Sequence, residues 1–183
     1  MTKLAWEPEK WDVVVVCADQ EFKGNSSVLS RVPFFKAALS NGFAESDAKR
    51  IPIGNTSVAA FRAVWHYLYT DDSVSVAKLD AAAELLDVLS LGKRFELPLL
   101  TQASNRRLIQ IMPTLPPDVL CQVFRVAKLH EQPNLYAACQ HWIGEIGGDF
   151  LKQDCVWDMI CKGDRALYEE VVNATMMKRR RTV

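Results

Sequence analysis

The residue types most often used in catalysis and metal binding are present in this sequence, but their spacing predicts no such site. The three histidines, His66, His130 and His141, lie far apart along the chain. His141 follows Cys139 by two positions, yet no second pair of ligands has the spacing of a zinc site. No cysteine has a recognisable base and orienting group near it in sequence, and no glycine-rich phosphate loop is present. We therefore expect no enzymatic activity, no metal and no cofactor.

Phe43 and Glu45 indicate a different kind of chemistry. They lie in the run Gly42-Phe43-Ala44-Glu45, where a phenyl ring precedes a carboxylate by two positions. That pair is a poor catalytic arrangement and a good docking one. Full burial of a phenylalanine contributes roughly 1.5–3 kcal/mol, which is enough for an interface hot spot, while a carboxylate at the rim favours orientation. Alternatively, Phe43 packs back onto its own domain, as apolar residues just past a helix often do.

Composition limits the kind of protein. The 183 residues are about half apolar, which suits one compact domain, or a domain with a small helical extension. Lysine plus arginine equals aspartate plus glutamate at 22 each, so we expect no direct nucleic-acid binding. The exception is the basic tail at 178–183, with Lys178, Arg179, Arg180 and Arg181. This run is either a nuclear import signal or a solubilising terminus.

Cysteine usage and hydropathy predict the compartment. The five cysteines are odd in number and scattered, which is typical of reduced thiols rather than of a disulfide framework. The first eleven residues contain no apolar run of the secretory kind. No stretch approaches the roughly 20 apolar residues that span a bilayer. We expect a soluble intracellular protein without a membrane partner, in the cytoplasm, the nucleus or both.

The elements that would position the Phe43 loop are a hairpin and two short helices. A β-branched run at 13–17, which we expect to be buried on both faces, leads through a turn into a return strand, so a hairpin is predicted at 12–23. Helices follow at 26–29 and, opened by Pro33, at 33–39. A third strand is predicted at 50–53, and Pro52 favours an edge position because it cannot donate to a ladder.

The rest of the chain has helical periodicity. Cap candidates at 55–57 precede an apolar face formed by Phe61, Val64, Trp65 and Leu68. Val74 and Val76 suggest a very short strand. Further helices are predicted at 79–94, 98–111, 118–130 and 134–146, with one or two short helices in 149–177. Strands first and helices afterwards indicate an α+β fold, a small sheet capped by helices and followed by an all-helical extension.

The order and spacing of these residues resemble the BTB/POZ domain. The resemblance rests on Asp12-Val13-Val14, Phe22, Val28-Leu29, Phe34-Phe35, Gly42-Phe43-Ala44-Glu45-Ser46 and Tyr67-Leu68-Tyr69-Thr70. It implies an N-terminal arm at 1–11, a BTB/POZ domain at 12–111 and the basic tail at 178–183. Residues 116–177 resemble the 3-box, or partial BACK-like, extension of ubiquitin-ligase substrate adaptors, through Leu115-Pro116-Pro117-Asp118-Val119-Leu120 and the helices after it.

The resemblance implies protein–protein interaction. Many BTB proteins form homodimers, and many dock cullin-3 through an apolar residue, any residue and an acidic residue, which Phe43-Ala44-Glu45 matches. A ubiquitin-ligase adaptor with an unknown substrate protein is the function implied, and a scaffold or transcriptional co-regulator without a ligase role is the alternative. The candidate dimer-interface residues are Trp6, Trp11, Val28 and Leu29. The two tryptophans cover either a partner subunit or their own core.

One segment departs from the family pattern. The family usually has Ala-His-Lys or Ala-His-Arg before the Val-Leu pair, where this chain has Gly24-Asn25-Ser26. Asp12 matches the acidic member of a charged pocket found in some dimeric members, and its basic partner would fall at Ser26. An aspartate and a serine cannot form that ion pair. The departure argues against the charged-pocket type of function and leaves the Phe43 loop intact.

Overall fold

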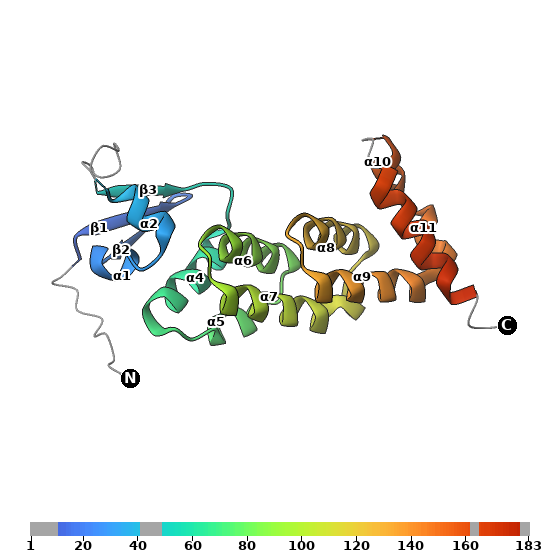
Figure 1. Cartoon of the computed structure of the whole chain (residues 1–183), viewed down its shortest axis with the longest axis horizontal. Coiled ribbons are helices and arrows are strands. Elements are labelled where there is room, and N and C mark those ends of the chain that lie inside the picture. The colour runs from blue at the N-terminus through green and yellow to red at the C-terminus, as the bar shows by residue number, and fades with distance from the viewer. Residues whose placement is uncertain (1–10, 41–48, 162–164, 180–183) are drawn as a thin grey trace. The chain divides into compact units, whose positions relative to one another are not determined.

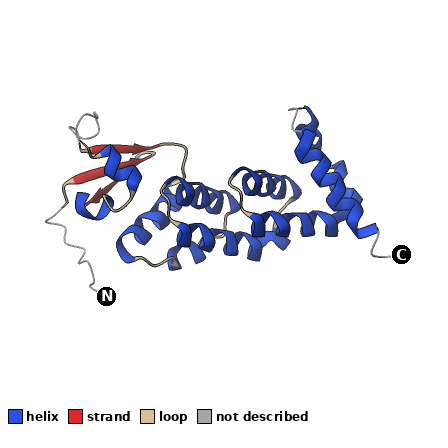
Figure 2. Ribbon diagram, viewed as in Figure 1, coloured by secondary structure: helices blue, strands red, loops and turns tan. Residues whose placement is uncertain are grey.

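A computed structural model describes residues 11–40, 49–161 and 165–179, and its helices and strands are drawn in Figures 1 and 2. Phe43, Glu45 and Trp6 lie outside the described residues. The chain divides into two compact units, residues 1–104 (unit 1) and residues 105–183 (unit 2), and each is considered by itself. The described strands end at Ile53 and only helices are described after them, so the predicted α+β class is confirmed.

Among the described residues, unit 1 contains a three-stranded sheet in the order β2-β1-β3 (Figure 1). The central strand β1 (Val13–Cys17) pairs antiparallel with β2 (Gln20–Gly24) and parallel with β3 (Arg50–Ile53). The predicted hairpin and the edge position of the strand that contains Pro52 are confirmed. The expectation that β1 is buried on both faces is wrong, because its residues alternate between buried and half-buried. A short sheet covered fully on one side produces this alternation.

Two short helices, α1 (Ser26–Leu29) and α2 (Pro33–Ala38), follow the hairpin as predicted. Asn25 caps α1 by accepting a hydrogen bond from the Ser27 N–H at 2.9 Å. Pro33 begins α2, where its missing N–H leaves no helical bond unmade. The buried side chain of Phe35 then fixes α2 to the core of the unit.

The helix α4 (Val58–Thr70) packs its apolar face against the sheet. Its predicted face is confirmed, since Phe61, Val64, Trp65 and Leu68 are all buried. The ring centres of Phe61 and Phe22, on β2, lie 4.9 Å apart in an edge-to-face arrangement. The Ser57 side chain caps the helix by accepting from the Ala60 N–H at 3.2 Å.

Residues 74–77 form a helical turn, α5 (Val74–Ala77), so the short strand expected at Val74 and Val76 is wrong. The Asp72 carboxylate accepts a hydrogen bond from the Val74 N–H at 2.9 Å, which favours a turn over an extended chain. Val76 is buried while Val74 is 52% exposed, so there is no shared apolar face of the kind that a strand would give. Two β-branched residues were therefore not enough to predict a strand.

The helices α6 (Ala82–Arg94) and α7 (Pro98–Ile111) complete the first part of the chain. Ser104 on α7 donates its hydroxyl to the Leu85 carbonyl on α6 at 2.5 Å, and both groups are buried. A buried hydroxyl needs such a partner, so this bond holds α7 in register with α6. The observed start of α6 is Ala82 rather than the predicted Leu79.

Unit 2 is helical. It contains a short turn η2 (Met112–Thr114), then α8 (Pro117–Leu129), α9 (Pro133–Ile146), η3 (Gly147–Lys152), α10 (Asp154–Cys161) and α11 (Arg165–Arg179). The last helix has 15 residues, so the prediction of only short helices after residue 149 is wrong. α11 packs on α9 and η3 through side chains that are completely buried: Leu135, Cys139, Ile143, Phe150, Leu167 and Val171. Among the described residues, none of the helices has the length and apolar character needed to cross a membrane.

Candidate functional site

The two described ends of the segment that carries Phe43 and Glu45 are both anchored. Before it, Ser40 donates its hydroxyl to the Lys36 carbonyl at 2.8 Å and so closes the end of α2. After it, the Lys49 carbonyl accepts from the Val14 N–H at 2.9 Å, at the start of β3. Arg50 then pairs with Glu21 on β2 at 2.8 Å. The described residues on either side of 41–48 are therefore held in place on unit 1.

An aromatic cluster lies directly before this segment, on α2 and α6. Phe35 and Phe95 are fully buried with ring centres 5.0 Å apart, and the half-buried Phe34 lies 4.9 Å from Phe95. The exposed guanidinium of Arg94 lies over the Phe34 ring, 4.4 Å from its centre. A cation over a ring face is a favourable contact that fixes the ring. The paired phenylalanines were visible in the sequence, but the contribution of Arg94 was not.

Asp12 and Ser26 lie together, as their alignment with the charged pocket of the BTB/POZ domain implied, and they form a capping interaction instead. One Asp12 carboxylate oxygen accepts from the Ser26 N–H at 2.7 Å, and the other accepts from the Ser26 hydroxyl at 2.6 Å. Asp12 is exposed rather than buried. Both of its oxygens are therefore engaged by the first turn of α1, where a carboxylate is stabilised by unpaired backbone donors.

The hydrogen bonds from Ser26 set the ionisation of Asp12. Partial burial would by itself raise the pKa of this carboxyl group, but the two bonds from Ser26 and the positive charge of Lys49 more than offset it. The pKa of Asp12 is consequently lowered below its usual value. Asp12 thus remains a carboxylate at neutral pH and is occupied within its own chain.

The neighbours of Gly24 on α4 explain why this position has no side chain. A Cβ atom at this position would lie 2.6 Å from the Tyr69 hydroxyl and 2.7 Å from the Trp65 ring, both closer than side chains tolerate. The Tyr69 oxygen also accepts a hydrogen bond from the Asn25 N–H at 2.8 Å. Trp65 and Tyr69 therefore fill the space that an alanine would take in the usual family pattern. The Gly24-Asn25-Ser26 departure is a change in packing as well as in charge.

The residues expected at a dimer interface differ in how much surface they offer. Trp11 is 37% exposed, and the backbone N–H of the next residue, Asp12, donates to the Gly24 carbonyl at 3.0 Å, which ties this part of the arm to the hairpin. Val28 and Leu29 are 5% and 0% exposed within the chain itself. Buried side chains have little area left for a second copy. Trp11 is therefore the described residue on which a test of the interface rests.

The described cysteines are held as neutral thiols. Burial, followed by the nearby charge of Asp87, raises the pKa of Cys17. Burial also raises the pKa of Cys139 to about 12. A thiol is a nucleophile only as its thiolate, so these side chains act as small apolar core residues. Within the described ranges, no group of three histidine, cysteine or acidic side chains is placed to hold a metal ion.

The basic run is described only in part. Lys178 and Arg179 are the last two residues of α11. Arg180 and Arg181 lie outside the described residues. The import signal and the solubilising tail both stay predictions.

Comparisons with known proteins extend this description. The family model of the BTB/POZ domain matches residues 1–112. BTB/POZ domain-containing protein 9 of Drosophila melanogaster is 24% identical over 152 residues, which cover 82% of this chain and 20% of that protein. A BTB/POZ domain-containing protein of Arabidopsis thaliana is 28% identical over 164 residues, 86% of this chain and 64% of that protein. The chain therefore spans less than two thirds of the length of either relative.

Proposed function

The chain belongs to the BTB/POZ family, and we propose that it is an adaptor that pairs with a second copy of itself and docks cullin-3 for ubiquitin transfer to a bound substrate. Protein–protein interaction is the general role of this domain. The observation that carries the finer proposal is the match of Phe43-Ala44-Glu45 to the apolar-any-acidic docking motif of the family. The described residues on both sides of that segment are held to unit 1 by hydrogen bonds, which supports the proposal because these flanks need not be ordered on binding.

Phe34, on the helix that precedes the docking segment in the chain, offers further contact area together with Arg94. Phe34 is half-buried, and its ring contacts both the Phe95 ring and the Arg94 guanidinium. Rigid aromatic side chains and arginine are the residues most enriched at interface hot spots. We propose that Phe43 enters a groove on the cullin and that Glu45 orients the complex from the rim.

Homodimerisation is the second part of the proposal. Trp11 supports it, because a large aromatic side chain at the edge of the hairpin remains 37% exposed. A second copy would cover that surface. Trp6 belongs to the same proposed contact.

A calorimetric titration of the purified chain with the N-terminal region of cullin-3 tests the docking part. We expect Phe43→Ala to weaken binding by about tenfold or more, which corresponds to loss of one buried phenyl ring. Glu45→Lys should slow association, because it removes an attractive charge. Added salt should then slow association less than it does for the unmodified chain. Asp19→Lys is the matched control, because Asp19 is an exposed acidic residue in the β1–β2 turn. Equal affinities for Phe43→Ala and the unmodified chain would rule out the docking assignment.

The alternative function is a scaffold or transcriptional co-regulator without a ligase role. A stable dimer that binds no cullin fragment would favour it. The contact between Asp12 and Ser26 argues against the kind of co-regulator that binds peptides in a charged pocket, because both Asp12 oxygens are already engaged. A scaffold would then rely on apolar contacts such as Trp11.

A further inference from the structure

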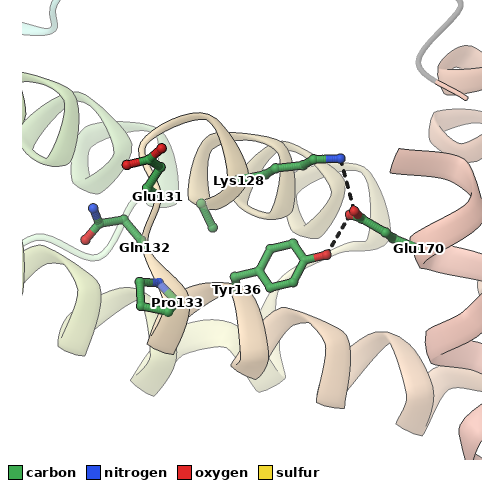
Figure 3. A pocket seen from close by; sticks show the side chains of 7 residues that line it. Lys128, Glu131, Gln132, Pro133, Tyr136 and Glu170 are labelled. Atoms are coloured by element: carbon green, nitrogen blue, oxygen red, sulfur yellow. Dashed lines mark hydrogen bonds and ion pairs between the residues drawn. The ribbon is translucent and has the colours of Figure 1, made fainter. Parts of the chain in front are cut away.

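A pocket of about 430 Å³ lies within unit 2, between α8, α9 and α11 (Figure 3). Its volume falls in the range of ligand-binding pockets, roughly 300–1,000 Å³. Ala127, Pro133 and the ring of Tyr136 give it apolar walls, and the charged residues at its edge are Lys128, Glu131 and Glu170. This pocket lies outside residues 1–112, so the inference does not rest on the BTB/POZ match.

The lysine of the pocket is already neutralised. Lys128 Nζ lies 3.1 Å from one Glu170 carboxylate oxygen, and the Tyr136 hydroxyl donates to the other at 2.6 Å (Figure 3). Burial, together with the hydrogen bond and charge of Glu170, raises the pKa of Tyr136 and keeps it a protonated donor. These contacts join α8, α9 and α11 and leave no free positive charge on this side of the pocket.

Glu131 supplies a charge that is not neutralised. It lies in the short connection between α8 and α9, in the left-handed backbone region with φ 53°. Its backbone N–H donates to the Lys128 carbonyl at 3.2 Å, which holds the residue at the edge of the pocket. No described residue forms an ion pair with its exposed carboxylate. Figure 3 shows Glu131 and Glu170 well separated, with Tyr136 lying between them.

The walls of the pocket are held in place before any ligand arrives. The Tyr136 ring stacks on the buried ring of Phe124, with centres 4.9 Å apart and planes 21° apart. The neighbouring Gln132 is 8% exposed, donates to the His130 carbonyl at 2.6 Å and accepts from the Asn105 amide at 2.6 Å. A wall whose rotamers are already fixed loses little entropy when it binds a ligand.

We propose that this pocket binds an arginine side chain from an extended segment of a partner protein. One lysine faces two glutamates, so the lining carries one net negative charge and attracts a cation. The aliphatic stem of the arginine lies along Ala127 and Pro133, and its guanidinium group meets the Glu131 carboxylate. Arginine fits better than lysine because its planar group packs on rings and pairs with a carboxylate through two hydrogen bonds.

The test is a titration of the whole isotope-labelled chain, in which nuclear magnetic resonance measures the shifts of the backbone amides. The probe is the blocked peptide acetyl-Gly-Ser-Arg-Ser-Gly-amide, and its matched control has citrulline in place of arginine. Citrulline has nearly the same shape and no charge. We expect saturable shifts at the amides of Glu131, Gln132 and Tyr136 with the arginine peptide and none with the citrulline peptide. The shifts should weaken as salt is added.

Three variants separate a charge-based pocket from a structural one. Glu131→Gln should weaken binding about two- to fivefold, the range of an exposed ion pair. Glu169→Gln on α11 is the control, since Glu169 pairs with Arg165 at 2.9 Å and does not line the pocket. Lys128→Met should strengthen binding, because it removes the positive charge of the lining, which repels a cationic ligand, while keeping an apolar stem. A variant that merely damaged the fold would not gain affinity.

Several outcomes would overturn the proposal. Equal shifts with the citrulline peptide would mean that charge is not recognised. A loss of affinity in Lys128→Met would mean that the net negative charge of the lining does not govern binding. Shifts at the same three amides that grow with protein concentration, without peptide, would assign the pocket to a basic segment of a second copy instead. Cullin binding by the same sample would be unaffected in every case, so failure here leaves the proposed function standing.

Discussion

The indole ring of Trp65 occupies the space that a Cβ atom on Gly24 would need. The nearest ring atom would lie 2.7 Å from that Cβ, and the Tyr69 hydroxyl would lie 2.6 Å from it. The end of β2 and the middle of α4 are therefore fitted to one another through the absence of a side chain. This close approach holds α4 against the hairpin that precedes the docking segment.

Gly24→Ala should destabilise the protein. The added methyl group meets a rigid ring and a hydroxyl that is fixed by the Asn25 N–H, so overpacking of about 1–3 kcal/mol is expected. Chemical denaturation followed by circular dichroism measures the free energy of unfolding. Gly54→Ala is the control, because nothing lies within 4 Å of the added Cβ and the change should stay within about 0.5 kcal/mol. Adding Trp65→Leu to Gly24→Ala should cost less than the sum of the two single changes.

Asp12→Asn should alter the dependence of stability on pH. The pKa of Asp12 is lowered in the folded protein, so its carboxylate contributes stability above the ordinary value of 3.8. That contribution is lost as the pH falls from this value through the lower folded pKa. Unfolding free energies of the two proteins should therefore differ most above pH 3.8 and converge below it. A difference that grows as the solution is acidified would contradict the role given to Ser26.

Cys139 should resist alkylation in the folded protein. Its pKa of about 12 leaves roughly one thiolate in ten thousand at pH 8. Its side chain is also completely buried beneath α11. Mass spectrometry after brief treatment with iodoacetamide should find Cys139 unmodified, and the same treatment in denaturant should modify it fully. Rapid modification of the native protein would show that this thiol is accessible.

Trp11→Ala should weaken self-association if the exposed indole is covered by a second copy. Light scattering over a series of protein concentrations measures the change, and we expect the midpoint of dimer formation to move to higher concentration. Leu99→Ala is a suitable control, since Leu99 is 59% exposed and lies on α7 rather than in the N-terminal arm. An identical concentration dependence for both variants would remove Trp11 from the interface.

Local patterns predicted the elements whose stability is local. The apolar face of α4 follows from its helical period and from the cap at Ser57, and the edge position of β3 follows from Pro52, which lacks a donor. The same reasoning gave a wrong prediction for the segment that contains Val74 and Val76. There a hydrogen bond from the Val74 N–H to the Asp72 side chain outweighed the preference of two β-branched residues for a strand.

Contacts between distant residues could not be predicted in this way. Neither the place of Arg94 over Phe34 nor the fit of Trp65 to Gly24 has a sequence pattern, because each depends on tertiary packing. The pocket beside Tyr136 could not be predicted either, since Glu170 contributes to it from another helix. The Asp12 and Ser26 pair was the exception, because a resemblance to a known family placed both residues at one site.

The mass of the complex with the N-terminal region of cullin-3 is the sharpest test of the proposed adaptor role. Size-exclusion chromatography with light scattering reports the stoichiometry of the assembly in solution. We expect a single species that contains two copies of this chain and two cullin fragments, and we expect Phe43→Ala to abolish it. Two separate peaks at the masses of the free components, at concentrations where the unmodified chain remains folded, would contradict it.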